Sequence, residues 1–482
     1  MKAKRWKRTL SIGLVLVMTV SVLAGCQSER TSSFQLEAME PEEAPAYSFE
    51  FIGGRDVMPI GGYYGPYVAD YSADAQTPPD YITDEIWEMI ADCGVNLMTY
   101  SIADYASTPQ AVIDNLKYGE KYGVAVTVFD SKVRNMGKNP SLDELTIRLS
   151  NYMNYPAFAG LYMIDEPCTD YFRPAGRKAA GTRYLDYYKT LAPILNQEIG
   201  VFTYANAYPS GIEAKEHKVY EQYIREFYDT LQPNYMLFDR YPFDAGEEGY
   251  MSRFFSDLAI VRMVAEENDV PFWTFVQAGS QWNDTKEHFD SVTPYYPTEG
   301  QFDWNVNVCL AFGAKGINFF PLIQPYFFAY AKSEPFDFER NSLIGAWGNK
   351  TQWYYYAQDV TKQIRAVDEV LMNATSKGVL AYGEQAITDV GLAENYGAVI
   401  KDTGWRELKS VDGDALVGCF NYQGKTALYV VNYNTEYSQE INLHFQDDYK
   451  VTVIQNAETK DIQGNGMTLD MLPGEGALLV FQ

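Results

Sequence analysis

Residues 158–167 read Phe-Ala-Gly-Leu-Tyr-Met-Ile-Asp-Glu-Pro. This segment is an apolar run that ends in two acids, Asp165 and Glu166, followed by a proline. A short apolar run closed in this way predicts a buried strand followed by a turn. Runs of the same kind recur along the chain with helical patterns between them. This alternation predicts repeated βα units around a parallel sheet.

Eight such runs can be placed, at 57–60, 95–99, 124–129, 160–164, 199–203, 235–238, 272–276 and 316–320. They lie about 37 residues apart, which suits a strand, two loops and a helix in each unit. The predicted fold class is therefore α/β, with a (β/α)8 barrel over residues 47–376. A doubly wound open sheet is the alternative.

The pattern changes after the last predicted helix, at 351–373. Short alternating runs follow, separated by turns such as Asp412-Gly413, and they lie at 417–422, 427–432, 439–445, 451–454 and 477–481. This spacing predicts that residues 377–482 form an antiparallel β-sandwich behind the barrel.

The N-terminus has the features of an export signal. Basic residues crowd the first eight positions, and an apolar run then closes on Leu23-Ala24-Gly25-Cys26. The run is shorter than the roughly 20 residues of a spanning helix, so we interpret 1–25 as a signal peptide. Its end resembles the bacterial lipobox, which implies lipid on Cys26. With a polar tether over 26–46, we expect an exported protein anchored only by lipid at the outer face of the cell membrane.

Composition excludes some classes of partner. The formal net charge of -26 argues against binding nucleic acid. The 3 His residues are scattered and no Gly-rich phosphate loop is present, so we expect neither a metal nor a cofactor. The 39 Tyr, 26 Phe and 8 Trp are more than core packing requires, and such rings are common in sugar-binding clefts.

The active site of a (β/α)8 barrel lies at the C-terminal ends of the strands. Most residues just after the predicted strands are polar or aromatic, and the candidates are Tyr63, Tyr64, Asp130, Asp165, Glu166, Tyr204, Asn206, Asp239, Tyr241, Gln277 and Gln324. Carboxylates, amides and tyrosines suit a neutral ligand with many hydroxyl groups. Trp282 and Trp304 are candidate stacking platforms, although such rings also pack against the barrel rim. Likewise Asp130 and Asn206 have an alternative as loop caps, and Asp239 as the ion-pair partner of Arg240.

The 158–167 segment resembles the strand-4 segment of glycoside-hydrolase barrels. Residues 302–320 and 347–356 resemble the passage from helix 7 to strand 8 and the start of helix 8 in several of these families. In their large retaining clan, the glutamate at the end of strand 4 is the general acid/base, and Glu166 matches that position. The resemblance implies a carbohydrate substrate, a polysaccharide or glycan outside the cell.

Cleaving a glycosidic bond takes one protonated carboxyl group to assist the leaving oxygen and one group to meet the oxocarbenium-like centre. Glu166 suits the first role if its pKa is raised, and a close carboxylate such as Asp165 or Asp239 would raise it. The structural alternative is that Asp165 caps the next helix, with Glu166 in its first turn.

The end of predicted strand 7 departs from the resemblance. The retaining clan carries its nucleophilic glutamate there, whereas this chain has Gln277, and an amide cannot be that nucleophile. Four alternatives remain open. The register of predicted strand 7 is off; or Glu299 or Asp303 serves from the following loop; or the acetamido group of an N-acetylhexosaminide attacks, oriented by Asp165 and held by Tyr204 or Tyr241; or the barrel binds glycans without cleaving them.

Overall fold

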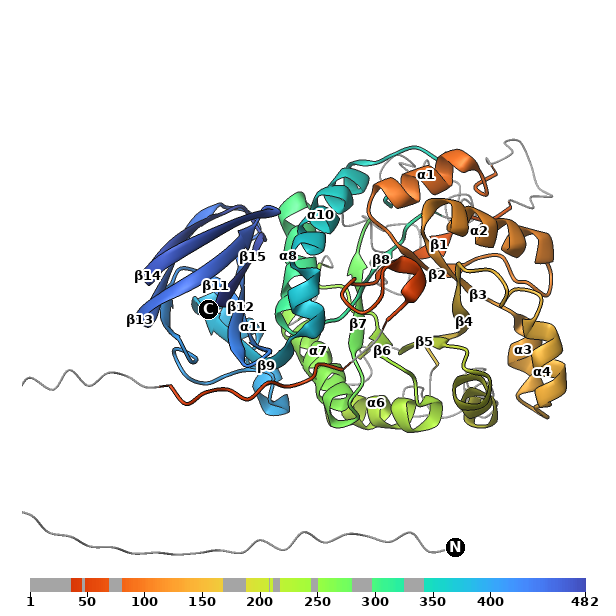
Figure 1. Cartoon of the computed structure of the whole chain (residues 1–482), viewed down its shortest axis with the longest axis horizontal. Coiled ribbons are helices and arrows are strands. Elements are labelled where there is room, and N and C mark those ends of the chain that lie inside the picture. Colours follow the sequence, from red (N-terminus) through yellow and green to blue (C-terminus); the bar gives the residue numbers. More distant parts are fainter. Residues whose placement is uncertain are drawn as a thin grey trace, which may run out of the picture. The chain divides into compact units, whose positions relative to one another are not determined.

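The computed structural model describes residues 36–45, 48–68, 80–167, 188–207, 209–210, 217–243, 250–279, 297–324 and 342–482. Residues 36–482 form one compact unit (Figure 1). In the part of the chain so described, no helix is long and apolar enough to cross a membrane.

Eight parallel strands form a closed barrel, in which β1 pairs with both β2 and β8. Closure confirms the predicted barrel and excludes the open sheet. The strands are β1 (Ile60–Gly65), β2 (Leu97–Ser101), β3 (Ala125–Val128), β4 (Phe158–Asp165), β5 (Thr203–Ala207), β6 (Met236–Phe238), β7 (Phe272–Gln277) and β8 (Ile317–Phe320).

Three strands lie further along the chain than predicted, and β2, expected at 95–99, is displaced by two residues. The expected strand at 57–60 begins only at Ile60, and its glycines belong inside the strand because a Cβ on Gly61 would lie 1.8 Å from Asn318 Oδ1. The expected strand at 199–203 begins only at Thr203, because residues 194–199 form a helical turn, η3 (Ile194–Ile199), that ends at a left-handed Gly200. Apolar residues of such a turn also pack on the core, so a short run does not distinguish it from a strand.

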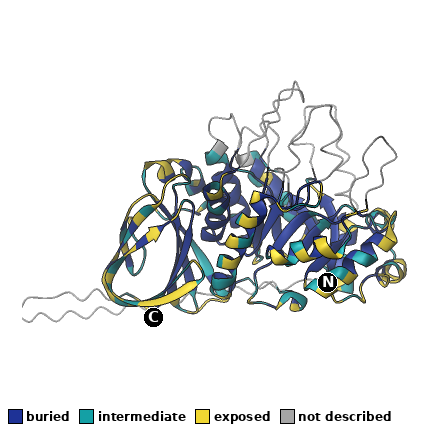
Figure 2. Cartoon of the chain, turned by 90° about the horizontal axis from the view of Figure 1, so that it is seen from above, coloured by how far each residue is buried: buried dark blue, intermediate teal, exposed yellow. Residues whose placement is uncertain are grey.

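Helices cover the barrel, and their buried sides face the strands while the exposed sides face outward (Figure 2). The chain enters the barrel through η1 (Glu50–Ile52). The described helices of the barrel are α1 (Asp84–Asp92), α2 (Pro109–Tyr122), α3 (Ser131–Met136), α4 (Leu142–Leu149), α6 (His217–Leu231), α7 (Tyr250–Glu267), α8 (Glu299–Ala311) and α10 (Gln352–Asn373).

Aromatic rings fill the half of the barrel interior that is nearer the N-terminal ends of the strands. Phe49, just before η1, stacks on Tyr204 at a centroid distance of 6.4 Å and also meets Trp273. Because this segment precedes β1, it lies at the N-terminal ends of the strands. The C-terminal ends are therefore the place for a site, as in barrels generally.

The C-terminal region is antiparallel, as predicted. Its elements are β9 (Thr375–Tyr382), α11 (Glu384–Asp389), η4 (Ala393–Tyr396), β10 (Leu408–Asp412), β11 (Ala415–Tyr422), β12 (Lys425–Asn432), β13 (Gln439–Gln455), β14 (Glu458–Met471) and β15 (Gly476–Phe481). The runs expected at 439–445 and 451–454 are one strand, β13, whose first half pairs with β10 and second half with β15. This change of partner folds the sheet over its own apolar core, which includes Leu443, Val453 and Leu428.

Helix α8 joins the barrel to this sheet. A Cβ on Gly418 of β11 would lie 2.3 Å from the backbone oxygen of Ala311 in α8, so the two elements are in close contact. Asn307 of α8 accepts a hydrogen bond from Tyr429 Oη at 2.7 Å and donates one to the Gly474 carbonyl at 2.9 Å.

The described part of the segment expected to be a tether, residues 36–45, lies against the folded unit. Arg406 donates to the Glu37 carbonyl at 2.7 Å, and Asn421 donates to the Glu40 carbonyl at the same distance. At the barrel side, Arg55 forms an ion pair with Glu43 at 2.9 Å. The signal peptide and Cys26 lie outside the described residues.

Candidate active site

Three acidic residues meet at the C-terminal ends of β4 and β6. Asp165 ends β4 and Glu166 follows it, and Asp239 directly follows β6. Asn206, near the end of β5, lies opposite Asp165 in the β4–β5 pair and opposite Leu237 in the β5–β6 pair. Neighbouring parallel strands therefore bring side chains from three separate predicted runs into one cluster.

Asp165 accepts three hydrogen bonds from neighbouring side chains. Tyr63 Oη donates at 2.9 Å, Tyr162 Oη at 2.8 Å and Asn206 Nδ2 at 3.3 Å. Asp165 is exposed to solvent by its surface area, although these three side chains surround its carboxyl group. Burial raises the pKa of Asp165 and the three hydrogen bonds oppose that rise, with a net upward shift.

Asp239 is 7% exposed, and its carboxyl group hydrogen-bonds that of Glu166. Two carboxyl groups in contact must share a proton, because two carboxylates offer only acceptors. Burial, and then the charge of Asp165, raise the pKa of Asp239, while the hydrogen bonds from Glu166 and Asn206 lower it; the result is about 7. The pair therefore retains a proton at mildly acidic to neutral pH.

The backbone of Glu166 is in the left-handed region, with φ 43°. Its N–H donates to the Asn206 carbonyl at 3.0 Å, which holds this conformation. A non-glycine residue with positive φ costs on the order of 1 kcal/mol or more, and such residues concentrate at functional sites. Tyr64, beside the acids, has φ 65°.

Aromatic side chains form a wall next to the acids. Tyr63 lies 4.7 Å from Tyr64 and 5.0 Å from Tyr100, measured between ring centroids. Tyr241 stacks on Phe320 at 5.5 Å and 28°. Burial, followed by the charge of Asp165, raises the pKa of Tyr100 to about 12. The hydroxyl of Tyr100 therefore stays protonated and can donate hydrogen bonds to an acidic or hydroxylated group.

Strand β7 ends with an amide side chain, at the position that the sequence predicted. Gln277 is the last residue of β7 and is fully buried. Its Nε2 donates to the Phe243 carbonyl at 3.1 Å, and its backbone N–H donates to Asn305 Oδ1 at 3.0 Å. This strand end therefore offers no carboxylate nucleophile.

Asp130 has a structural environment. Its carboxylate accepts from Arg148 Nε at 2.7 Å and from Tyr152 Oη at 3.1 Å, and it caps α3 through the backbone N–H groups of Lys132 and Val133. Its side chain is fully buried, which supports the loop-cap alternative rather than contact with a ligand.

Tyr204 lies deeper than expected. Because β5 starts at Thr203, Tyr204 lies within the strand instead of after it, and its ring is fully buried against Phe49, Tyr235 and Trp273. Its hydroxyl donates to the Ala159 carbonyl at 3.2 Å. Tyr241, the other tyrosine considered for this role, lies near both Asp239 and Glu166.

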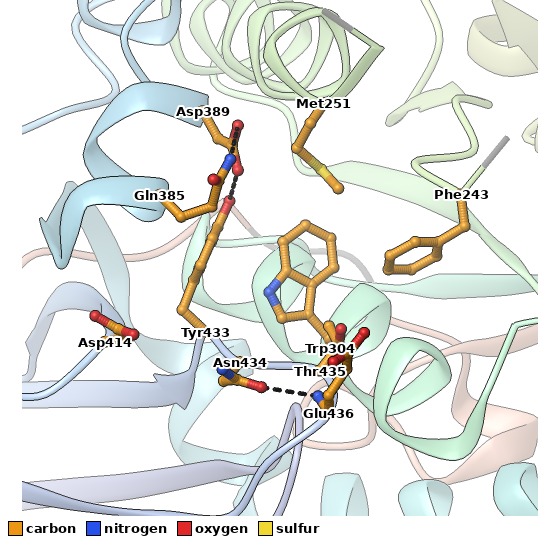
Figure 3. Close-up of a pocket in the computed structure, with 10 residues that line it drawn as sticks. All are labelled: Phe243, Met251, Trp304, Gln385, Asp389, Asp414, Tyr433, Asn434, Thr435 and Glu436. Carbon is orange, nitrogen blue, oxygen red and sulfur yellow. Dashed lines mark hydrogen bonds between the residues drawn. The ribbon is translucent and has the colours of Figure 1, made fainter. Parts of the chain in front are cut away.

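Trp304 lies at the contact between barrel and sheet. It is 1% exposed, with ring centroids 5.5 Å from Phe243 and 5.4 Å from Tyr433. Figure 3 shows it between these rings in a pocket of about 290 Å³, and Asp165, Glu166 and Asp239 are not among the residues that line this pocket. On the same helix, Asp303 interacts with Glu299 and Glu475, and burial raises its pKa.

The remaining candidates divide as follows. Gln324, 6% exposed after β8, donates its backbone N–H to the Ile344 carbonyl at 2.9 Å. Trp282 lies outside the described residues. No group of three or more His, Cys, Asp or Glu that could hold a metal occurs among the residues that the structure describes.

Sequence reasoning missed Tyr162, which contacts Asp165 directly. It lies in the middle of an apolar run, and a strand buried on both faces has no polar alternation that would mark one residue as functional. Its position three residues before Asp165 was the available signal, because the barrel interior brings Tyr162 Oη to the Asp165 carboxylate.

Comparison with solved structures shows the same architecture elsewhere. A β-galactosidase from Bacillus circulans sp. alkalophilus aligns with 92% of this chain and 100% of its own, with a TM-score of 0.53 and 10% identity. A family 42 β-galactosidase from G. stearothermophilus aligns with 92% of this chain and 99% of its own, with a TM-score of 0.53 and 9% identity. The chain thus shares the fold of these two enzymes. No family model and no curated protein sequence matches it.

Proposed function

We propose that the protein is an O-glycosyl hydrolase that acts on a polysaccharide or glycan outside the cell, with Glu166 as the general acid. The observation that carries this proposal is the hydrogen-bonded Glu166–Asp239 carboxyl pair at the C-terminal ends of the barrel strands. A carboxyl pair that keeps one proton near neutral pH supplies the acid that the leaving oxygen of a glycoside requires.

The three acids take different roles in this mechanism. Glu166 delivers the proton, and Asp239 keeps that proton on the pair through its burial and negative charge. Asp165, whose oxygens accept three hydrogen bonds, faces the positive charge that develops on the sugar. The tyrosine wall provides donors and flat surfaces for a sugar ring.

The spacing of the acids bears on the mechanism. Retaining glycosidases hold their two carboxyl groups about 5–5.5 Å apart and inverting enzymes about 6.5–9.5 Å apart. A side-chain hydrogen bond couples Glu166 to Asp239, so no sugar ring can lie between these two carboxyl groups while it is formed. Asp239 therefore fits the role of proton partner better than that of a nucleophile across the substrate.

A substrate-assisted N-acetylhexosaminidase is the second candidate. It is favoured by Gln277 at the end of β7, because attack by the acetamido group needs no protein nucleophile there. Asp165, fixed by Tyr63 and Tyr162 next to Glu166, has the environment of a group that orients such an acetamide.

The test is Glu166→Gln, with Glu120→Gln on the exposed surface of α2 as the matched control. We expect turnover of unactivated glycosides to fall about 10²- to 10⁴-fold, and to fall less with leaving groups that need no proton. A panel with and without 2-acetamido groups distinguishes the two mechanisms. Full activity of the Glu166→Gln protein on an unactivated glycoside would contradict the assignment, and glycan binding without cleavage by the unaltered protein would favour a non-catalytic lectin-like role.

A further inference from the structure

Asn206 contacts all three acidic residues of the cluster. Its Nδ2 donates to Asp239 Oδ1 at 2.9 Å and to Asp165 Oδ1 at 3.3 Å. Its backbone carbonyl accepts the N–H of Glu166 at 3.0 Å. Because β5 lies between β4 and β6 in the barrel, this residue is placed between the two strands that carry the acids.

The orientation of the amide matches this role. Asn206 is 3% exposed, and both hydrogens of Nδ2 are directed at carboxyl oxygens. The buried Oδ1 has no hydrogen-bond partner among the described residues. If the amide were turned the other way, its oxygen would face the oxygens of two acids. In the observed orientation the Nδ2 group donates to both carboxyl groups, and Oδ1 is left without a donor.

We propose that Asn206 is a positioning residue that bridges Asp165 and Asp239, fixes the backbone of Glu166, and so determines how the three acids share protons. This inference rests on the proposed function for its catalytic meaning, but the bridge itself can be tested without a substrate. Notably, Asn206 was expected to contact sugar hydroxyls or to cap a loop; here its amide hydrogens are already used by the protein.

The expected electrostatic effect has a definite sign. Asp239 is surrounded by Glu166 and Asp165 from β4, by Tyr241 from its own strand end and by Tyr220 from α6. The amide of Asn206 is a donor that favours ionised Asp239 against burial and the charge of Asp165. Without this amide, burial and the charge of Asp165 raise the pKa of Asp239 further, so Asp239 should keep its proton to higher pH.

The experiment measures the pH dependence of unfolding for Asn206→Ala, alone and combined with Asp239→Asn. A hydrogen bond to a charged group corresponds to about one pH unit, so the titration attributed to Asp239 should move up by about one unit. Asn206→Asp keeps the shape and adds a like charge, and its shift should be larger. Asn307→Asp, a buried asparagine at the contact between α8 and the sheet, is the matched control and should leave this titration in place.

The outcomes separate cleanly. The proposal predicts that the pH-dependent effect of Asn206→Ala disappears in the Asp239→Asn background, and that the alkaline limb of kcat/KM moves up with the titration. Lowered stability at all pH values with no shift in titration would overturn it, and Asn206→Asp keeps this decision available if Asn206→Ala does not fold. If no glycoside is cleaved by the unaltered protein while the shift is seen, the proposed function fails and the bridge stands.

Discussion

Asp239 shows how a single residue can favour function over stability. Folding moves its carboxyl group from water to a site with 7% exposure, next to two other acids. The nearest basic side chain in the sequence, Arg240, instead donates to the Ser210 carbonyl at 2.8 Å and lies 3.9 Å from Asp257. The alternative in which Asp239 is the ion-pair partner of Arg240 is therefore not supported, because the carboxylate near Arg240 is that of Asp257.

Asp239→Asn should stabilise the protein above neutral pH. The folded-state pKa of Asp239 is raised to about 7, so the stability from its bound proton is complete below the ordinary pKa near 4 and is lost as the pH rises through about 7. The asparagine variant does not lose this stability. Its free energy of unfolding, taken relative to that of the unaltered protein, should therefore be about 2–4 kcal/mol higher at pH 8 than at pH 4. Denaturant unfolding at several pH values measures this, with exposed Asp143→Asn as the control; a difference independent of pH would contradict it.

At the scale of an element, β4 is the strand on which the site depends. It carries Tyr162 and Asp165 and leads directly into Glu166, and it pairs with β3 and β5 through irregular registers on both sides. Gly160 lies inside it with φ 133°, and a Cβ there would lie 2.4 Å from the Phe202 carbonyl oxygen. The close approach of β4 and the chain entering β5 therefore requires glycine.

Gly160→Ala should destabilise the protein by about 3 kcal/mol or more, since it combines a strained backbone with a collision against a fixed carbonyl. Gly200→Ala is the matched comparison, because Gly200 also has a positive φ, 78°, but nothing lies within 4 Å of a Cβ there. That variant should lose only about 1–2 kcal/mol. Urea unfolding of both proteins measures the difference, and equal losses would show that sterics at Gly160 are relieved by movement of β5.

At the scale of the whole molecule, the barrel and the C-terminal sheet share one packed boundary. Helix α8 is buried between them, with Trp304, Phe255 and Tyr433 in ring contact across the boundary. In addition, Lys315 before β8 is buried and donates to the carbonyls of Leu371 and Ala374, which lie at the end of α10 and directly before β9.

A chain that ends at residue 376 should be insoluble or lose cooperative unfolding, because it exposes the apolar face of α8 and leaves the hydrogen bonds of Asn307 unmade. Circular dichroism melting and gel filtration, with the chain from residue 27 to 482 as the control, test this. A truncated protein that melts cooperatively as a monomer would show that the sheet is dispensable for the barrel.

Membrane attachment stays a prediction from the sequence. The mature N-terminus should be a diacylated Cys26, because the segment before it ends as a lipobox does. Mass spectrometry of protein extracted from membranes should find the lipid, and Cys26→Ser should release the protein into the soluble fraction. Unmodified Cys26 in membrane-extracted protein would rule the anchor out.

The sequence by itself determined the succession of strands and helices and the antiparallel C-terminal region, and it favoured a barrel over an open sheet, which the closure of the barrel then excluded. Local periodicity carries this information, because each apolar run must be buried wherever it lies. It also marked Asp165 and Glu166, since two acids that end an apolar run stand out. Two strands whose predicted runs are bounded by glycine or by a helical turn begin a few residues later than predicted, at Ile60 and Thr203. Local patterns do not determine where the pairing between strands starts.

Only the tertiary structure decided which polar residues meet. Asp239 and Asn206 join Asp165 and Glu166 through the lateral order of β4, β5 and β6, whereas Asp130, with the same position after a strand, is held by Arg148. Tyr162 hydrogen-bonds Asp165, whereas Trp304 packs against Tyr433, although both are aromatic residues in apolar surroundings. The physical reason is that a site depends on contacts between residues far apart in the chain, and those distances are determined by strand register and helix packing rather than by any local pattern.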